Sequence, residues 1–198
     1  DGKITKDDKT IIGNAMPKAF GGFNLNARFK GFDLSAAFSF VLGNDIYNAN
    51  KIEFTNSSKY YNRNMLSMVE DRFTHIDWET GSRITDPEQL KAANTDARMW
   101  SPTMASNYFV HSWAIEDGSF LRLNTLTLGY SLPKQLLKKA YIQNCRFFFT
   151  GTNLFCLTNY SGFDPEVDTR RKTPMTPGVD YSAYPKSRGY NFGVNLTF

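Results

Sequence analysis

The stretch GYNFGVNLTF (189–198) alternates strictly between two kinds of side chain. Every second residue is apolar or aromatic: Tyr190, Phe192, Val194, Leu196 and Phe198. The residues between them are small or polar and uncharged: Asn191, Gly193, Asn195 and Thr197. A period of two places the two sets on opposite faces of a β-strand. An uncharged second face and a terminal aromatic favour a membrane-barrel strand, with lipid on one side and water on the other.

Length and composition allow one domain of ordinary size, because the chain has 198 residues. Aromatic residues make up 15% of the chain, yet the mean hydropathy is −0.43. No run of about 18 apolar residues occurs, so no transmembrane helix is expected. The net charge of +4 comes from interleaved basic and acidic residues, which does not indicate a nucleic-acid-binding surface. The polar start DGKITKDDKT is not a signal peptide, so we expect any export signal to lie upstream.

The same alternation recurs in two neighbouring segments, 20–31 and 32–43. In the first, Phe23, Leu25 and Ala27 share one parity, and polar residues occupy the other. Lys30 and Gly31 form a tight-turn signal between the two segments. Two alternating runs joined by a short glycine turn predict a β-hairpin.

Further along the chain, the pattern predicts three more strands and three long loops. The predicted strands are 119–133, 146–158 and 186–198, and the predicted loops are 1–19, 44–118 and 159–185. Leu126, Leu128 and Tyr130 form the apolar face of the first of these strands, whereas the two faces of 146–158 are not distinct.

Short and long connections alternate along this series of strands. That arrangement indicates an up-and-down membrane barrel with one short-loop rim and one long-loop rim. Five strands cannot close such a barrel, because the smallest has about 8, and an open edge in lipid leaves backbone groups unsatisfied. The missing strands and any plug are therefore expected in another segment or another chain.

Two features of the sequence are candidate ligand sites. DGKITKDD (1–8) matches the second half of a calcium loop, with Asp1 and Asp8 as ligands; the alternative is a polar turn before a strand. Aromatic residues in the predicted loops offer faces for sugar rings or peptide side chains, or else pack the loops together. The candidates for ligand binding are Trp78, Trp100, Tyr108 and Trp113.

No enzyme is predicted. His75 and His111 are the only histidines, and neither belongs to an HExxH-type pattern. Nucleophile-elbow, phosphate-loop and C-x-x-C motifs are also missing. No cofactor is expected apart from the calcium of the half-motif.

Several long strings of the sequence, in order, resemble the C-terminal part of the SusC/RagA family. The strings are DGKITKDDKTIIGNAMPKAFGGF (1–23), KGFDLSAAFSF (30–40), GNDIYN (43–48), EDGSFLRLNTLTLGYSLP (116–133), TGTNLFCLTNYSGFDPEV (150–167) and GVDYSAYPKSRGYNFGVNLTF (178–198). Members of this family are TonB-dependent outer-membrane transporters of the Bacteroidetes. The resemblance covers nearly the whole chain except about 50–110.

The resemblance implies an all-β fold: the last five antiparallel strands of a plugged outer-membrane barrel of about 22 strands, with the long loops extracellular. It also implies a SusD-like surface lipoprotein as a lid, import of oligosaccharides or peptides, and energy from TonB. The plug, the other barrel strands and the TonB-contacting segment would belong to the part of the transporter outside this sequence. Phe198 resembles the family's barrel-assembly signal. Within GFDPEV, Asp164 and Glu166, with nearby Asp168, would contact ligand or metal, or else form a proline-pinned turn.

Two other classes of protein compete with the transporter segment. One is a soluble β-sandwich module that binds carbohydrate, in which the apolar strand faces would form the core. The other, a secreted enzyme, has the least support in the sequence.

Overall fold

The computed structural model describes residues 9–57, 62–101, 112–138, 141–167 and 177–198. The chain divides into two compact units. The first unit combines Asp1–Tyr47 with Ile115–Phe198, and the second is Asn48–Ala114.

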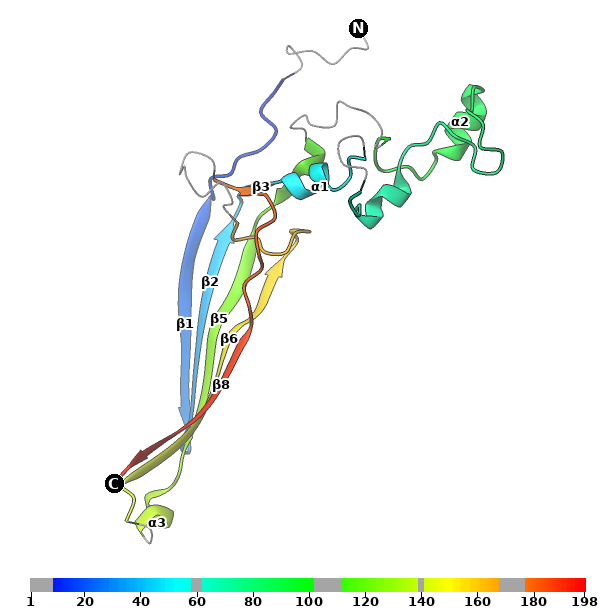
Figure 1. Ribbon diagram of the computed structural model, residues 1–198. Helices are drawn as coiled ribbons and strands as arrows, with labels where there is room; N and C mark the ends of the chain where they lie inside the picture. The colour runs from blue at the N-terminus through cyan, green and yellow to red at the C-terminus, as the bar shows by residue number, and fades with distance from the viewer. Residues whose placement is uncertain (1–8, 58–61, 102–111, 139–140, 168–176) are drawn as a thin grey trace. The chain divides into compact units, whose positions relative to one another are not determined.

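An antiparallel sheet of five strands dominates the first unit (Figure 1). In spatial order the strands are β1 (Ala19–Phe29), β2 (Phe32–Leu42), β5 (Phe120–Ser131), β6 (Asn144–Thr158) and β8 (Gly189–Thr197). Each strand pairs with the next in an up-and-down meander. The strands lie where the alternating segments predict them, with shifts of at most three residues at their ends. The chain is therefore mostly β, with an antiparallel sheet.

The predicted hairpin between β1 and β2 is confirmed. Phe29 pairs with Phe32, which leaves Lys30 and Gly31 as a two-residue turn. Both turn residues have positive φ, 46° and 89°. This is the turn whose twist matches that of antiparallel strands, and it favours glycine at one central position.

The larger sheet leaves both faces uncovered over most of its area. Strand β1 is exposed along its whole length, and β8 is exposed except at two glycines. On the apolar face, Phe192 is 77% exposed, although aromatic rings on this face contact their neighbours across the strands. The ring centroids of Phe23 and Phe38 are 4.7 Å apart, and those of Phe149 and Phe192 are 4.9 Å apart. The rings form a continuous apolar surface that no other described element buries.

Strand β5 contains a bulge that the alternation pattern does not predict. Leu123 pairs with Phe38 and Thr125 with Ala37, so Asn124 is an extra residue relative to β2. One extra residue reverses the parity of the strand. Both halves of β5 can therefore present leucines to the same face.

The bulge assigns each half of β5 to its face. Leu121 and Leu123 join Leu126 and Leu128 on the apolar face, although the two pairs differ in parity. Arg122, the only charged residue of β5, lies on the polar face opposite Ser39 of β2.

The register also assigns the faces of β6. Phe149 lies between Leu128 and Phe192 and therefore belongs to the apolar face. Phe148 belongs to the polar face, where its ring covers Gly193 of β8. A Cβ atom at Gly193 would lie 2.3 Å from the Phe148 ring, so only glycine leaves room for this ring.

A second, smaller sheet forms within the segments predicted as long loops. Its strands are β3 (Asp45–Asn48), β4 (Ile115–Asp117) and β7 (Val179–Asp180), in the order β4-β3-β7. Figure 1 shows β3 at one end of the larger sheet and α3 (Lys134–Leu137) at the other, near the C-terminus. Predicting 44–118 and 159–185 as loops alone was therefore incomplete.

Buried residues beside the small sheet form its core. Ile46, Tyr160 and Val167 pack together. The Tyr160 hydroxyl donates a 2.6 Å hydrogen bond to Oδ2 of Asp180, which is 1% exposed. Burial, together with this hydrogen bond, raises the pKa of Tyr160 well above its ordinary value. The phenol therefore stays a neutral donor to the buried carboxylate.

Replacing Tyr160 with phenylalanine is expected to destabilise this region by about 1–3 kcal/mol, because buried Asp180 loses a donor. Hydrogen exchange of the Ala183 amide, which donates to Asp180, measures the effect. Tyr184→Phe is the control, because Tyr184 is 91% exposed. Equal exchange in the two variants would contradict the assigned role.

The second unit contains short helices and connecting segments. They are α1 (Ala49–Glu53), the 3-10 helices η2 (Ser67–Asp71) and η3 (Ser112–Ala114), and α2 (Pro87–Ala93). Asp86 caps α2 by accepting a hydrogen bond from the Glu88 amide, and Pro87 occupies its first turn. None of the helices in the described residues is long and apolar enough to cross a membrane.

Candidate functional site

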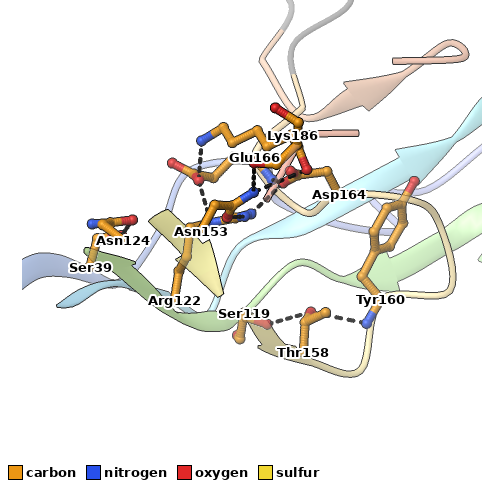
Figure 2. A network of polar contacts seen from close by, with 11 residues as sticks. Ser39, Ser119, Arg122, Asn124, Asn153, Thr158, Tyr160, Asp164, Glu166 and Lys186 are labelled. Atoms are coloured by element: carbon orange, nitrogen blue, oxygen red, sulfur yellow. Dashed lines mark hydrogen bonds and ion pairs between the residues drawn. The ribbon is translucent and has the colours of Figure 1, made fainter. Parts of the chain in front are cut away.

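A network of charged and amide side chains lies on the polar face near the start of β5 (Figure 2). Arg122 is its centre, and its side chain is only 4% exposed. Nη2 donates to Asp164 Oδ1 at 2.5 Å, and Nη1 donates to Asn153 Oδ1 at 2.6 Å. Nε lies 2.8 Å from Glu166 Oε2, as an ion pair rather than an aligned hydrogen bond. The buried guanidinium thus meets two carboxylates and an amide.

Asn153 connects this network to the segment that precedes β8. It has a φ of 53°, a left-handed conformation that asparagine tolerates better than most residues. The Nδ2 atom of Asn153 donates to the carbonyl oxygens of Lys186 and Ser187, at 3.0 and 3.2 Å. Lys186 also forms an ion pair with Glu166. The left-handed conformation of Asn153 in β6 therefore directs its side chain toward both Arg122 and the residues that lead into β8.

The carboxylates of GFDPEV belong to this network. Asp164 is buried against Arg122, and the Glu166 amide donates back to Asp164. Within the part of the chain that the structure describes, no group of three or more potential ligands could hold a metal ion. Two interpretations of GFDPEV were open, contact with a ligand or metal and a turn fixed by proline. The turn agrees with these contacts. Asp168 lies outside the described residues.

A second ion pair crosses the polar face toward the opposite end of the sheet. Arg146 of β6 donates to both carboxylate oxygens of Asp33 on β2, at 2.9 and 2.5 Å. The pair passes over Gly129 of β5, where a Cβ atom would lie 2.4 Å from the guanidinium. A glycine in the middle strand is therefore required for this contact.

The predicted aromatic ligand-binding residues do not form one cluster in the described structure. Trp100 and Trp113 contact edge to face, with ring centroids 4.5 Å apart. Lys51 Nζ lies 4.3 Å from the Trp113 ring centre and donates to its carbonyl oxygen. Trp78 is 68% exposed and lies against Arg72 instead. Tyr108 lies outside the described residues.

An open hollow of about 650 Å³ lies beside the tryptophan pair in the second unit. Its lining includes Phe73, His75 and Arg98 besides Trp100 and Trp113. An aromatic surface with neighbouring cationic and imidazole groups can stack on a ring and pair with an anionic group. Ligand binding by these residues stays a prediction.

The other candidates lie near the two ends of the chain. Asp1 and Asp8 are outside the described residues, so the calcium site stays a prediction. Phe198 directly follows β8, and its side chain is 76% exposed.

None of Arg122, Asn153 and Arg146 was predicted from the sequence as a site residue. The sequence nevertheless contained a signal for the two arginines, because each is the only charged residue in its strand. A single charge in such a strand requires a partner or water, and it marks the polar face.

An open antiparallel sheet with one apolar, uncovered face and one face carrying ion pairs is typical of a segment of an outer-membrane barrel. Comparison with known proteins agrees. The chain is homologous to the TonB-dependent receptors of the SusC/RagA family. These receptors are transporters of the outer membrane, not enzymes.

Similar proteins match over essentially the whole chain. Identity is 28% with TonB-dependent receptor P3 of Formosa agariphila over 100% of this chain and 18% of that receptor. It is 24% with TonB-dependent receptor SusC of Bacteroides thetaiotaomicron, again over 100% of this chain and 17% of the receptor. The chain thus spans less than a fifth of the length of these relatives. No protein-family model matches the chain.

Solved structures give the same result. A chain of the RagAB peptide importer in its closed-closed state matches with a TM-score of 0.75 and 28% identity. The match covers 100% of this chain and 19% of that chain. The open-open state of the same importer matches with a TM-score of 0.73 and 26% identity.

Proposed function

We propose that the chain forms the last five strands of a transmembrane barrel of about 22 strands. The observation that carries this proposal is a sheet whose two faces are both uncovered over most of their area. A soluble β-sandwich would bury one face of each sheet against a second sheet, and the carbohydrate-binding module considered from the sequence would need such a core. In a membrane barrel, lipid covers the apolar face and the lumen hydrates the polar face.

In this arrangement the strand edges find partners within the complete receptor. Strands β1 and β8 end the five-stranded sheet, and open edges leave backbone groups unsatisfied in lipid. Further strands of the same barrel would pair with both edges. Segments 1–19, 44–118 and 159–185 would then be extracellular, and α3 would lie at the periplasmic rim.

The complete receptor would import a nutrient, either oligosaccharides or peptides, together with a SusD-like lipoprotein and with energy from TonB. The similarity to RagAB makes peptides the first substrate class to test. The plug and the TonB-contacting segment would belong to the rest of the receptor.

The test is to purify the complete receptor from membranes in detergent and to measure the mass of the intact complex. A receptor that carries a lipoprotein subunit would support the proposal, and the mass of a bound molecule would identify the substrate class. A monodisperse species that remains soluble without detergent would contradict it and favour the soluble module.

The predicted calcium site at Asp1 and Asp8 can be tested independently of the barrel. Titration calorimetry of the complete receptor is expected to detect calcium binding that Asp8→Ala weakens, because a carboxylate ligand is lost. Asp96→Ala is the control, since Asp96 lies outside the half-motif. Equal calcium affinity in the Asp8 variant and the unmodified receptor would exclude Asp8 as a ligand.

A further inference from the structure

The segment after β6 turns back onto the polar face of the sheet. Arg122 projects from that face, and it is nearly fully buried because Asp164 and Glu166 approach it from residues 159–167. The residues that lead into β8 are attached at the same place. Asn153 donates to the carbonyl oxygen of Lys186, and Glu166 forms an ion pair with the Lys186 side chain. Figure 2 shows these side chains converging on Arg122. Both ends of the β6–β8 connection are therefore attached at one point on the polar face.

Further contacts attach the same connection away from Arg122. Ser161 donates to the Glu116 carboxylate through both its amide and its hydroxyl, at 2.8 and 2.9 Å. Tyr160 binds buried Asp180, and Val167 packs in the core with Ile46. The connection is therefore attached along its length as well as at its two ends, which is not expected of a flap that moves about hinges at its ends.

A buried guanidinium is costly unless its charge and its donors are matched. Asp164 and Glu166 match the charge of Arg122 only while residues 159–167 remain on the polar face. Moving them away would leave the guanidinium with the Asn153 amide but without a carboxylate partner. The position of the connection and the burial of Arg122 therefore depend on each other.

We propose that Arg122 is a positioning residue that fixes residues 159–167 and 177–187 as a rigid wall on the lumen side of the barrel mouth. The inference rests on the proposed function, because the polar face is the lumen side only in a barrel. It adds to the expectation of an extracellular loop at 159–185 that the described parts of this loop are fixed to the polar face. Exposed aromatic residues on this wall, such as Phe163 and Tyr184, are then presented in a fixed arrangement to whatever enters the lumen.

Hydrogen exchange of the complete receptor in lipid nanodiscs tests the proposal. Arg122→Met keeps an unbranched apolar stem but removes the guanidinium, with its charge and its donors. We expect exchange in residues 159–167 to accelerate at least tenfold, with strands β1 and β2 unchanged. Lys186→Met removes the same charge from a half-exposed side chain of the network, and it should have a much smaller effect.

A double variant tests whether faster exchange comes from loss of the attachment or from the Asp164 carboxylate left buried without its partner. Arg122→Met combined with Asp164→Asn removes the unpaired buried charge, and we expect exchange to remain fast. A return to the original rate, or an unchanged rate in Arg122→Met, would overturn the proposal. Asp164→Asn alone perturbs less and gives the same comparison if Arg122→Met does not assemble.

The same samples distinguish this proposal from the proposed function. Protected β1 and β2 strands in lipid, with unaltered exchange at 159–167, would reject the wall but retain the barrel. Failure of the unmodified receptor to insert into lipid would reject the barrel and the wall together.

Discussion

A lysine in place of Phe192 is expected to prevent most of the receptor from assembling. Phe192 lies on the apolar face of β8, is 77% exposed and contacts Phe149 of β6. A lysine on the lipid face of a barrel costs about 2–4 kcal/mol near the middle of the bilayer and less near its surfaces. Loss of the aromatic contact adds to this cost, so the destabilisation is a large part of a typical folding free energy.

Asn191→Lys is the matched control for this prediction. It introduces the same charge one residue away, on the polar face opposite Thr150. The amount of folded barrel in the outer membrane is the measurement, taken from the heat-modifiable band of the receptor. We expect a strong decrease for Phe192→Lys and a near-normal level for Asn191→Lys. Similar levels for the two variants would refute the assignment of the faces.

Deletion of Phe198 is the second change with a large expected effect. The residue follows β8 directly and exposes 76% of its side chain. Its position continues the parity of the apolar residues of β8, and the resemblance to the family gives it the role of an assembly signal. We expect the deletion to leave only a minor fraction of the receptor assembled.

Phe198→Tyr separates the aromatic character from the exact side chain. It retains a ring at the terminus, and we expect assembly close to that of the unmodified receptor. Phe198→Ala should resemble the deletion. Unchanged barrel levels after deletion would show that Phe198 is not needed for assembly.

Strands β1, β2 and β8 of the larger sheet were predictable because most of their side chains obey a local rule. Strand β8 alternates without interruption, β1 and β2 alternate over most of their length, and Lys30-Gly31 meets the stereochemical requirement of a two-residue turn. Each of these signals depends on neighbouring residues alone.

The irregular parts of the sheet were not predictable in the same way. The extra residue Asn124 reverses the parity of β5, so a single alternation rule cannot describe the strand. The faces of β6 depend on its register with β5 and β8, not on its own sequence. Short strands such as β7, with two residues, carry almost no local signal and pair across long stretches of chain.

The polar network depends on contacts between residues distant in sequence. Arg122 is 42 residues from Asp164, and Arg146 is 113 residues from Asp33. The sequence showed single charges in largely uncharged strands, but it did not show which residues they meet. For GFDPEV, the chemistry of the two carboxylates allowed a metal, a ligand or a turn. Only the fold brings a buried arginine to them.

The most direct test of the central claim is a spin-label scan of β8 in the complete receptor, reconstituted in lipid. Labels at single cysteines from 190 to 197 report collisions with oxygen, which dissolves in lipid, and with a water-soluble nickel complex. We expect a period of two, with oxygen preferred at Tyr190, Phe192, Val194 and Leu196 and the nickel complex preferred at Asn191 and Asn195. Equal access of the nickel complex at every position would show that the apolar face does not meet lipid and would contradict the account.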